Sequence, residues 1–329
     1  MEKFLLISRK ISWKNFGKKI RFYNPSFVDY ETSNVNTHPY SFPSISITGK
    51  NCALNCKHCN GKILNAMIPA KTPKDLINIC KDLKLKGSLG CLISGGSLSD
   101  GSLPLEEFTD AIGKIKKEIG LKLVVHTGLT NSSIVEKLKN AGIDAALIDI
   151  IGSNETIKEI CKLEKTVDDF DQSMKFLSEN QVTFVPHLIV GLHYGKLKGE
   201  FESVKIISKY NPASIVVIAF MPVKGTEMEK IKPPAPEDIA KMIAFTRIKN
   251  PKVPIVLGCV RPLGKHRKKT DELAIKAGVN GMAYPSEEAI DLAKSMGLKI
   301  NFSSICCSQI YEEYEAEQKN NLSNLQRKL

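Results

Sequence analysis

The alternation of short apolar segments with amphipathic segments is the feature that most constrains the fold. The apolar segments are rich in β-branched residues and nearly continuous in hydrophobicity, which is typical of parallel strands buried on both faces. Helix-like segments such as PLEEFTDAIGKIKKEIG and SSIVEKLKNAG separate them, and several end in Gly or Asn, as helices often do. The eight predicted strands are residues 44–48, 91–96, 122–128, 145–153, 183–191, 214–222, 254–262 and 281–285.

This rhythm predicts an α/β fold, a single (β/α)8 TIM-type barrel that is closed or partly open. Strands that are each followed by a helix, at roughly thirty-residue spacing, are typical of such barrels. A doubly wound open sheet is the alternative, because periodicity alone cannot show closure. No Gly/Ser linker divides the series, so we expect one barrel domain over residues 41–300. Residues 1–40 are expected to form an N-terminal extension and residues 301–329 a C-terminal one.

The formal charge of +12 favours an acidic partner, such as nucleic acid, an acidic carrier protein or an anionic cofactor. No RNA- or DNA-binding signature accompanies the charge, and basic stretches such as GKHRKK are most often solvated surface, so nucleic acid is not expected. The N-terminus has an apolar run of only four residues, and no uninterrupted apolar stretch reaches membrane length. We therefore expect a cytoplasmic protein with no membrane partner.

Three of the nine cysteines, Cys52, Cys56 and Cys59, fall within the ten residues NCALNCKHCN that follow the first predicted strand. In a barrel this loop lies at the carboxyl-terminal face, where chemistry is normally sited. A zinc site usually requires four ligands, and His58 could supply one, but zinc ribbons pair two CxxC motifs and no second motif exists here. A four-iron cube held by three cysteines instead leaves one iron free to bind a substrate or cofactor.

The CxxxCxxC motif in this position resembles the hallmark of the radical S-adenosylmethionine (SAM) enzymes. The resemblance implies that Cys52, Cys56 and Cys59 hold a catalytic [4Fe–4S] cluster whose free iron chelates the amino and carboxylate groups of SAM. An electron from the cluster would then split the sulfonium and release a 5′-deoxyadenosyl radical. The residue before the third cysteine is commonly aromatic in this family, and here His58 would pack on the adenine.

Other strand ends agree with the same family. SGGS, with Ser94, Gly95 and Gly96, resembles the motif whose backbone meets the methionine amino group, although Ser97 replaces the usual acidic residue. By similarity, Asp149 would accept from the ribose hydroxyls, and a carboxylate inside an apolar strand is costly unless it is paired. HLIVGL resembles a further family motif and FMPVKGT would close over the adenine edge, which adds Ile189, Gly191 and Met221 to the predicted cofactor site.

The other six cysteines fall into two groups. Cys80, Cys91 and Cys161 lie within apolar patterns and are interpreted as buried thiols. Cys259 lies at the carboxyl end of the seventh predicted strand, and the adjacent Cys306 and Cys307 follow the eighth unit. These three could hold an auxiliary cluster, with Ser303, Ser304 or Arg261 nearby. The alternative is one core cysteine and two without a ligand role.

The barrel also resembles the biotin synthase and lipoyl synthase group of radical SAM enzymes. Biotin synthase holds its second cluster by cysteines on inner strands and an arginine on the seventh strand, which Arg261 matches approximately. Here the third and fifth strands carry valines in place of cysteines, and the N-terminal cysteine triplet of lipoyl synthase is missing, since no cysteine precedes residue 52. CALNCKHCNGKIL, GCLISGG and LGCVRPLGK are most similar to a subunit of the archaeal two-component lipoyl synthase.

That resemblance implies a sulfurtransferase that inserts sulfur into an unactivated C–H bond of a protein-bound octanoyl chain. It also implies an acidic lipoyl-carrier protein or octanoylated lysine as substrate, a second radical SAM subunit and an electron donor. A biotin synthase-like or other radical SAM enzyme acting on a small-molecule precursor is the alternative function. A non-catalytic iron–sulfur protein is the third interpretation, and only the enzymes would form 5′-deoxyadenosine.

Overall fold

The protein folds around one curved parallel sheet. The computed structural model describes residues 1–26, 31–32, 35–36 and 39–316. Eleven strands form the sheet in the order β13-β1-β12-β11-β10-β9-β8-β7-β6-β4-β5, and every pairing in it is parallel. A separate two-stranded antiparallel hairpin consists of β2 (Glu31–Thr32) and β3 (Val35–Asn36).

All eight predicted strands are present, and they lie side by side in sequence order. Their buried, β-branched residues form the central part of the sheet, as expected for parallel strands covered on both faces. These strands are β4 (Ser44–Ser46), β6 (Gly90–Ser94), β7 (Lys122–His126), β8 (Ala145–Ile150), β9 (Phe184–Val190), β10 (Ile215–Ala219), β11 (Ile255–Leu257) and β12 (Gly281–Ala283). The predicted α/β barrel class is confirmed.

The barrel is partly open. In a closed eight-stranded barrel β12 would pair with β4, but here β1 (Lys19–Tyr23) pairs with β12, and β13 (Lys299–Ser303) pairs with β1. The short β5 (Ile68–Pro69) ends the other side of the sheet, next to β4. Residues 19–23, from the region expected to be an N-terminal extension, therefore form a sheet strand.

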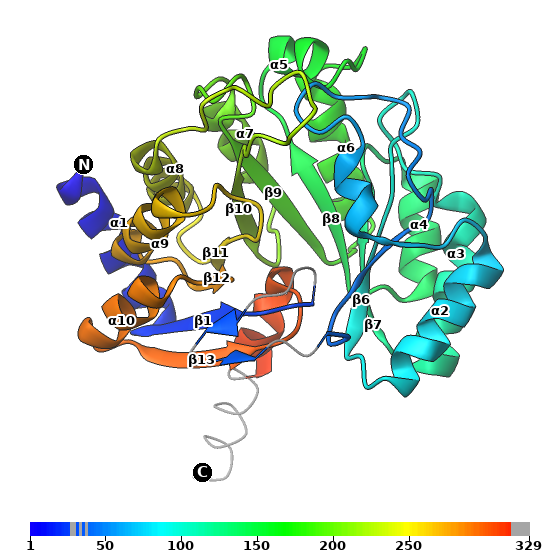
Figure 1. Ribbon diagram of the computed structural model, residues 1–329, viewed down its shortest axis with the longest axis horizontal. Coiled ribbons are helices and arrows are strands. Elements are labelled where there is room, and N and C mark those ends of the chain that lie inside the picture. Colours follow the sequence, from blue (N-terminus) through cyan, green and yellow to red (C-terminus); the bar gives the residue numbers. More distant parts are fainter. Residues whose placement is uncertain (27–30, 33–34, 37–38, 317–329) are drawn as a thin grey trace.

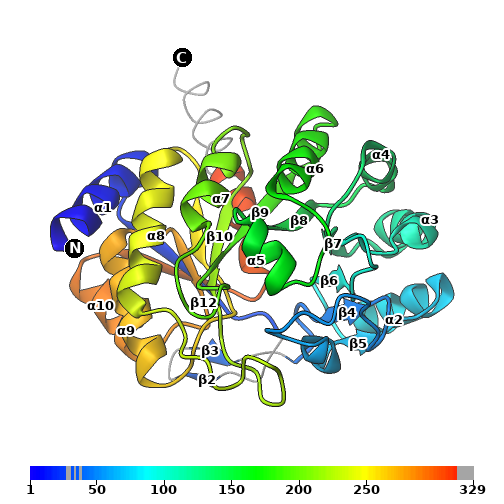
Figure 2. The same ribbon diagram turned by 90° about the horizontal axis from the view of Figure 1, so that it is seen from above.

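Most of the helices cover the convex face of this sheet, whereas α5 (Asn154–Glu159) lies over its end and residues 310–316 are helical on the concave face (Figures 1 and 2). The other labelled helices are α1 (Glu2–Phe16), α2 (Pro73–Leu85), α3 (Thr109–Lys114), α4 (Ser132–Ala141), α6 (Val167–Glu179), α7 (Glu200–Ile207), α8 (Pro236–Lys249), α9 (Lys265–Ala277) and α10 (Glu287–Ser295), with a π-helical turn at Ile115–Ile119. A doubly wound sheet would carry helices on both faces. Among the described residues, no helix has the length and hydrophobicity needed to span a bilayer.

The concave face is filled at its amino-terminal end by a C-terminal segment, residues 306–316, which is coloured red in Figure 1. Tyr311 donates to the carbonyl of Asp144 at 2.9 Å, and Ser214 donates to the carbonyl of Ser308 at 2.7 Å. Asp144 and Ser214 each precede a strand, which places this segment at the amino ends of the strands. Its apolar and sulfur side chains pack against Leu92, Val124, Leu147, Val185, Val216 and Val256 of the strands.

Candidate active site

The loop between β4 and β5 carries the three motif cysteines. Cys56 and Cys59 are buried, with 8% and 7% of their surfaces exposed, whereas Cys52 is half-buried. One ligand atom each of Cys56, His58 and Cys59 lies within 4.8 Å of the others. The motif therefore gathers soft sulfur and nitrogen ligands into one small volume, as a metal centre requires.

Hydrogen bonds raise the pKa of two of these thiols. The thiol of Cys56 donates to the carbonyl of Cys161 at 3.3 Å, and this bond raises the pKa of Cys56. The hydrogen bond between Cys59 and Cys56, and then burial, raise the pKa of Cys59 to about 12. Metal ligation requires thiolates, so binding a cluster must displace both protons. Cys52 is not in this compact group but is near enough to affect the pKa of Cys56. Two gathered thiols with a third close by fit a site-differentiated iron–sulfur cluster.

The glycine pair after β6 packs directly against the cysteine loop. A Cβ atom at Gly96 would lie 2.0 Å from the carbonyl oxygen of Asn51 and 2.6 Å from the Cα atom of Cys52, so only glycine permits this approach. The backbone N–H of Gly96 donates to the hydroxyl of Thr48 at 2.7 Å. Ser94, the last residue of β6, faces the concave side and is buried, and a cavity of about 490 Å³ opens beside Cys52 and Gly96.

Asp149 on β8 lies on the concave face near the cysteine loop. It has the same orientation as Leu147, which packs on that face. Burial raises the pKa of Asp149, and the nearby imidazoles of His126 and His58 oppose this shift. His58 therefore lies between the metal-binding loop and Asp149, and its Nδ1 atom is buried without a hydrogen-bond partner in the described chain. A buried carboxyl group at this position could accept from ligand hydroxyl groups, although no ligand contact is present to test that role.

The three residues predicted to surround the adenine occupy different environments. Ile189 on β9 keeps accessible surface on the concave face, and Met221, after β10, is half-buried. Gly191 is instead enclosed by the protein. Its N–H donates to Glu200 at 2.8 Å, and at φ 77° a Cβ atom would meet the ring of Pro234 at 2.6 Å. The glycine at this position is therefore required by the packing of the chain itself.

A polar contact braces the cysteine loop against the loop after β9. The ammonium of Lys57, next to Cys56, donates to the hydroxyl of Tyr194 at 2.8 Å, and that hydroxyl donates to Glu159 at 2.6 Å. Glu155, Glu159 and His193 also bring ligand atoms within 4.8 Å of one another. Both carboxylates already have partners, because Lys198 pairs with Glu155 and Tyr194 donates to Glu159. This cluster is accordingly an ionic brace.

The second group of predicted ligands, Cys259, Cys306 and Cys307, converges at the concave face. Cys306 and Cys307 are buried in the same apolar cluster, against which the half-buried Cys259 packs. Burial, followed by the nearby Cys306, raises the pKa of Cys259 to about 11. The hydroxyl of Ser308 donates to the sulfur of Cys306 at 3.1 Å, and hydrogen bonds from Cys307 and Ser308 lower the pKa of the Cys306 thiol.

Arg261 lies near these thiols but cannot serve as a cluster ligand in this conformation. It is fully buried, and its guanidinium donates to Asp271 at 2.7 and 3.1 Å, to the carbonyl of Gly258 at 2.7 Å and to the carbonyl of Tyr284 at 3.0 Å. Arg261 therefore already has internal partners at the position that resembles the biotin synthase arginine. Asp271 lies on α9, ten residues after Arg261 in the chain. It binds the guanidinium group that a cluster ligand would need to have free.

Replacing Asp271 by Ala is expected to lower the free energy of unfolding by about 3–5 kcal/mol, because it leaves a buried, unpaired guanidinium. The double variant Arg261→Met, Asp271→Leu removes both charges and should recover most of this loss. Urea unfolding followed by circular dichroism measures the effect. Glu288→Ala, which breaks the exposed pair with Lys268, is the control and should leave the midpoint almost unchanged. A small effect of Asp271→Ala would contradict this assignment of Arg261.

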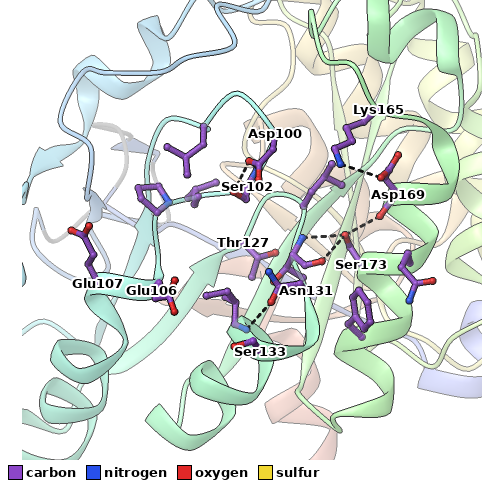
Figure 3. Close-up of a pocket in the computed structure, with 18 residues that line it drawn as sticks. Asp100, Ser102, Glu106, Glu107, Thr127, Asn131, Ser133, Lys165, Asp169 and Ser173 are labelled. Carbon is purple, nitrogen blue, oxygen red and sulfur yellow. Dashed lines mark hydrogen bonds and ion pairs between the residues drawn. The ribbon is translucent and has the colours of Figure 1, made fainter.

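A second cavity, of about 520 Å³, lies outside the cysteine site, among the loop after β6, the loop after β7 and α6 (Figure 3). Three of its acidic side chains, those of Asp100, Glu106 and Asp169, are engaged within the chain, and Glu107 also lines it. Asp100 accepts from Ser102 at 2.6 Å, Glu106 pairs with Lys137, and Asp169 accepts from the N–H of Thr166 at 2.8 Å. This cavity is therefore lined in part by groups with internal partners and is separate from the cysteines.

Two histidines at the concave face were missed as site residues. His126, the last residue of β7, was not singled out, and His187 on β9 was noted only as a departure from a glycine motif. Their rings lie 5.3 Å apart between centroids. The available signal was a polar residue inside each of two apolar strands, LVVH and FVPHLIV. The buried-thiol interpretation of Cys80, Cys91 and Cys161 is confirmed.

Comparison with known proteins now identifies the group. The pattern of the radical SAM superfamily matches residues 46–197, and that of the biotin and thiamin synthesis associated domain matches residues 217–328. A biotin synthase from Acetivibrio thermocellus is 24% identical over 321 residues, covering 91% of this chain and 90% of the relative.

Solved structures support the same fold. Methylornithine synthase (PylB) has a TM-score of 0.62 at 16% identity, covering 96% of this chain and 91% of that chain. Streptococcus suis SuiB bound to S-adenosylmethionine has a TM-score of 0.53 at 17% identity, covering 76% and 59% of the two chains. The chain is therefore a radical SAM enzyme of the biotin synthase and lipoyl synthase-like group, with a [4Fe–4S] cluster and SAM as its cofactors.

Proposed function

We infer that this enzyme inserts sulfur into an unactivated C–H bond of a protein-bound octanoyl chain, as one component of a lipoyl synthase. The observation that carries the proposal is the convergence of Cys259, Cys306 and Cys307 on the concave face. Two of these cysteines come from a segment after the barrel and one from the end of β11, so packing brings together thiols that are far apart in sequence. A set of thiols on the same face as the radical-generating site is what a sulfur donor would need.

In this proposal Cys52, Cys56 and Cys59 hold the radical SAM cluster, which when bound supplies the electron that cleaves SAM. The backbone at Ser94, Gly95 and Gly96 would accept the methionine amino group, and Asp149 would accept from the ribose. His58, Ile189 and Met221 would line the adenine, whereas Gly191 is enclosed by Pro234 and Glu200. The brace between Lys57 and Tyr194 keeps the cysteine loop in place against the loop after β9.

Cys259, Cys306 and Cys307 would hold an auxiliary iron–sulfur cluster that is consumed as the sulfur donor. Among the described residues, their sulfur atoms are not in a ligand set gathered within 4.8 Å. When bound, this cluster would supply the sulfur that replaces a hydrogen atom of the acyl C–H bond.

The charge distribution supports an acidic carrier protein as the partner that presents the octanoyl chain. The loops after β9, β10 and β11 carry the exposed lysines Lys196, Lys224 and Lys265. Val260 and Leu263, in the loop after β11, are 45% and 64% exposed. Basic groups around exposed apolar side chains suit an acidic protein surface. A second radical SAM subunit and an electron donor complete the proposed system.

A biotin synthase-like reaction on a small precursor is the second candidate, and the 24% identical relative that covers 91% of this chain favours it. Val124 and Val185 weigh against a cluster of the biotin synthase type, because both face the concave side where inner-strand cysteines would be needed. Arg261 is also held by Asp271. These observations weigh against a cluster of the biotin synthase type and leave the radical chemistry common to both candidates.

Incubation of the reconstituted, reduced enzyme with SAM and either an octanoyl-lysine peptide or dethiobiotin separates the two candidates. We expect the peptide to gain the mass of sulfur, with 5′-deoxyadenosine formed alongside. The assay is run with and without the candidate second subunit, since one chain would insert one of the two sulfurs. Sulfur in dethiobiotin but not in the peptide would overturn the octanoyl proposal and leave the second candidate.

A further inference from the structure

Five adjacent strands direct one side chain each toward the carboxyl-terminal end of the concave face. These side chains keep accessible surface, whereas the layer beneath them is buried and apolar, with Val124, Leu147, Val185, Val216 and Val256. The accessible residues are His126 on β7, Asp149 on β8, Ile189 on β9, Ile218 on β10 and Cys259 after β11. From β7 to β11, the accessible side chains therefore change from polar to aliphatic and end with a thiol.

The polar end is built from two imidazoles and a carboxyl group. Asp149 and His187 are direct partners in the register of β8 and β9, so their side chains share the concave face. The rings of His126 and His187 lie 5.3 Å apart with an interplanar angle of 32°. His187 is 9% exposed, and its Nδ1 atom has no hydrogen-bond partner among the described residues. A buried, unsatisfied polar atom at a site of this kind points to a missing ligand.

Burial favours the neutral form of both imidazoles. Burial, followed by the neighbouring His126, lowers the pKa of His187 to about 3, and burial also lowers the pKa of His126. A neutral imidazole offers one donor and one acceptor. None of the five accessible residues listed above is cationic, and Arg261 is paired with Asp271. This end of the site therefore suits a neutral group with both N–H and C=O, and disfavours a carboxylate.

We propose that His126 and His187 recognise the neutral N–H and C=O head of the substrate, with its aliphatic chain lying across Ile189 and Ile218 toward Cys259. The inference rests on the proposed sulfur insertion. The head could be the amide of an octanoyl-lysine or the ureido group of dethiobiotin, since both present this chemistry. β9 and β11 are separated by two strand spacings, about 10 Å, which is a span that a medium-length acyl chain can cross.

Equilibrium dialysis on the cluster-loaded, SAM-bound and unreduced enzyme tests this pair without turnover. Three ligands are compared, namely an octanoyl-lysine peptide, dethiobiotin and octanoate. We expect the wild type to bind one of the two neutral-headed ligands at least tenfold more tightly than octanoate, and the tighter one identifies the source of the head. In His187→Leu and His126→Leu this preference should fall to about threefold or less, with octanoate binding unchanged. His187→Gln keeps a donor and an acceptor, so it should retain most of the preference.

His266→Gln is the matched control, because His266 lies on α9 and already bonds to the carbonyl of Pro234 at 2.8 Å. Equal binding of octanoate and both neutral ligands to the wild type would overturn the inference. So would a loss of SAM binding in His187→Leu with the ligand preference intact, because that assigns the pair to the cofactor. Tighter binding of dethiobiotin would contradict the octanoyl substrate but support recognition of a neutral head by the two histidines. The two proposals can therefore fail separately. Chemical shifts of ¹⁵N-labelled histidines in the wild type, which should change on adding the neutral ligand, provide the test if a variant fails to fold.

Discussion

Replacing Cys56 by Ala should remove about four irons from the anaerobically reconstituted chain and abolish the formation of 5′-deoxyadenosine. Cys56 is one of three thiols expected to hold the radical SAM cluster, and its sulfur lies in the compact group with Cys59 and His58. A four-iron cluster held by only two cysteines has two irons without a protein ligand, and it is expected to dissociate. Iron analysis, electron paramagnetic resonance of the reduced protein and mass detection of 5′-deoxyadenosine measure the effect.

Cys161→Ala is the control for this prediction. Cys161 is buried next to the cysteine loop, but its backbone carbonyl, rather than its thiol, accepts the bond from Cys56. The variant therefore removes a neighbouring sulfur without removing an expected ligand, and it should keep the iron content and the activity of the wild type. A Cys56→Ala protein with full iron content and normal cleavage of SAM would refute the assignment of the motif.

The central strands were predictable because their signal is local. Each of the segments from 44–48 to 281–285 is apolar along its own length, so no knowledge of partners was needed. β1 and β13 were not predicted as strands. In KIRFY, the charged residues Lys19 and Arg21 interrupt the apolar pattern, and they are accommodated by Tyr314 and Glu313 of the C-terminal segment. The barrel is open because β1 and β13 continue the sheet past β12. Local sequence patterns therefore could not decide between a closed and an open barrel.

The motif cysteines were predictable for the same reason, since three ligands within one loop have a fixed spacing. His126 and His187 were not, because they meet only through strand register, and Asp149 and His187 lie 38 residues apart in the chain. Arg261 illustrates a contact that local patterns do not reveal. Its position on the seventh predicted strand matched a ligand role, but Asp271 on α9 binds its guanidinium group. The residues of the strand alone do not indicate that ion pair.

Replacing both Cys306 and Cys307 by Ala should lower the iron content from about eight to about four per chain while SAM cleavage continues. The two thiols lie on the C-terminal segment at the concave face. Cys306 helps to raise the pKa of Cys259, and Cys259 helps to raise that of Cys307, whereas the loop of Cys52 belongs to a different part of the site. Radical formation and sulfur transfer should therefore separate. The variant should form 5′-deoxyadenosine in the presence of the octanoyl-lysine peptide without adding sulfur to it.

The matched control is Cys80→Ala with Cys91→Ala, a second pair of neighbouring buried thiols, which lies in the outer apolar cluster between α2 and β6. This double variant removes the same number of sulfur atoms from the core and should keep both iron sites. Acid-labile sulfide should fall in parallel with iron in the Cys306 and Cys307 variant only. An iron content equal to that of the wild type would show that these thiols hold no cluster, and the sulfur for any insertion would then have to come from outside this set of cysteines.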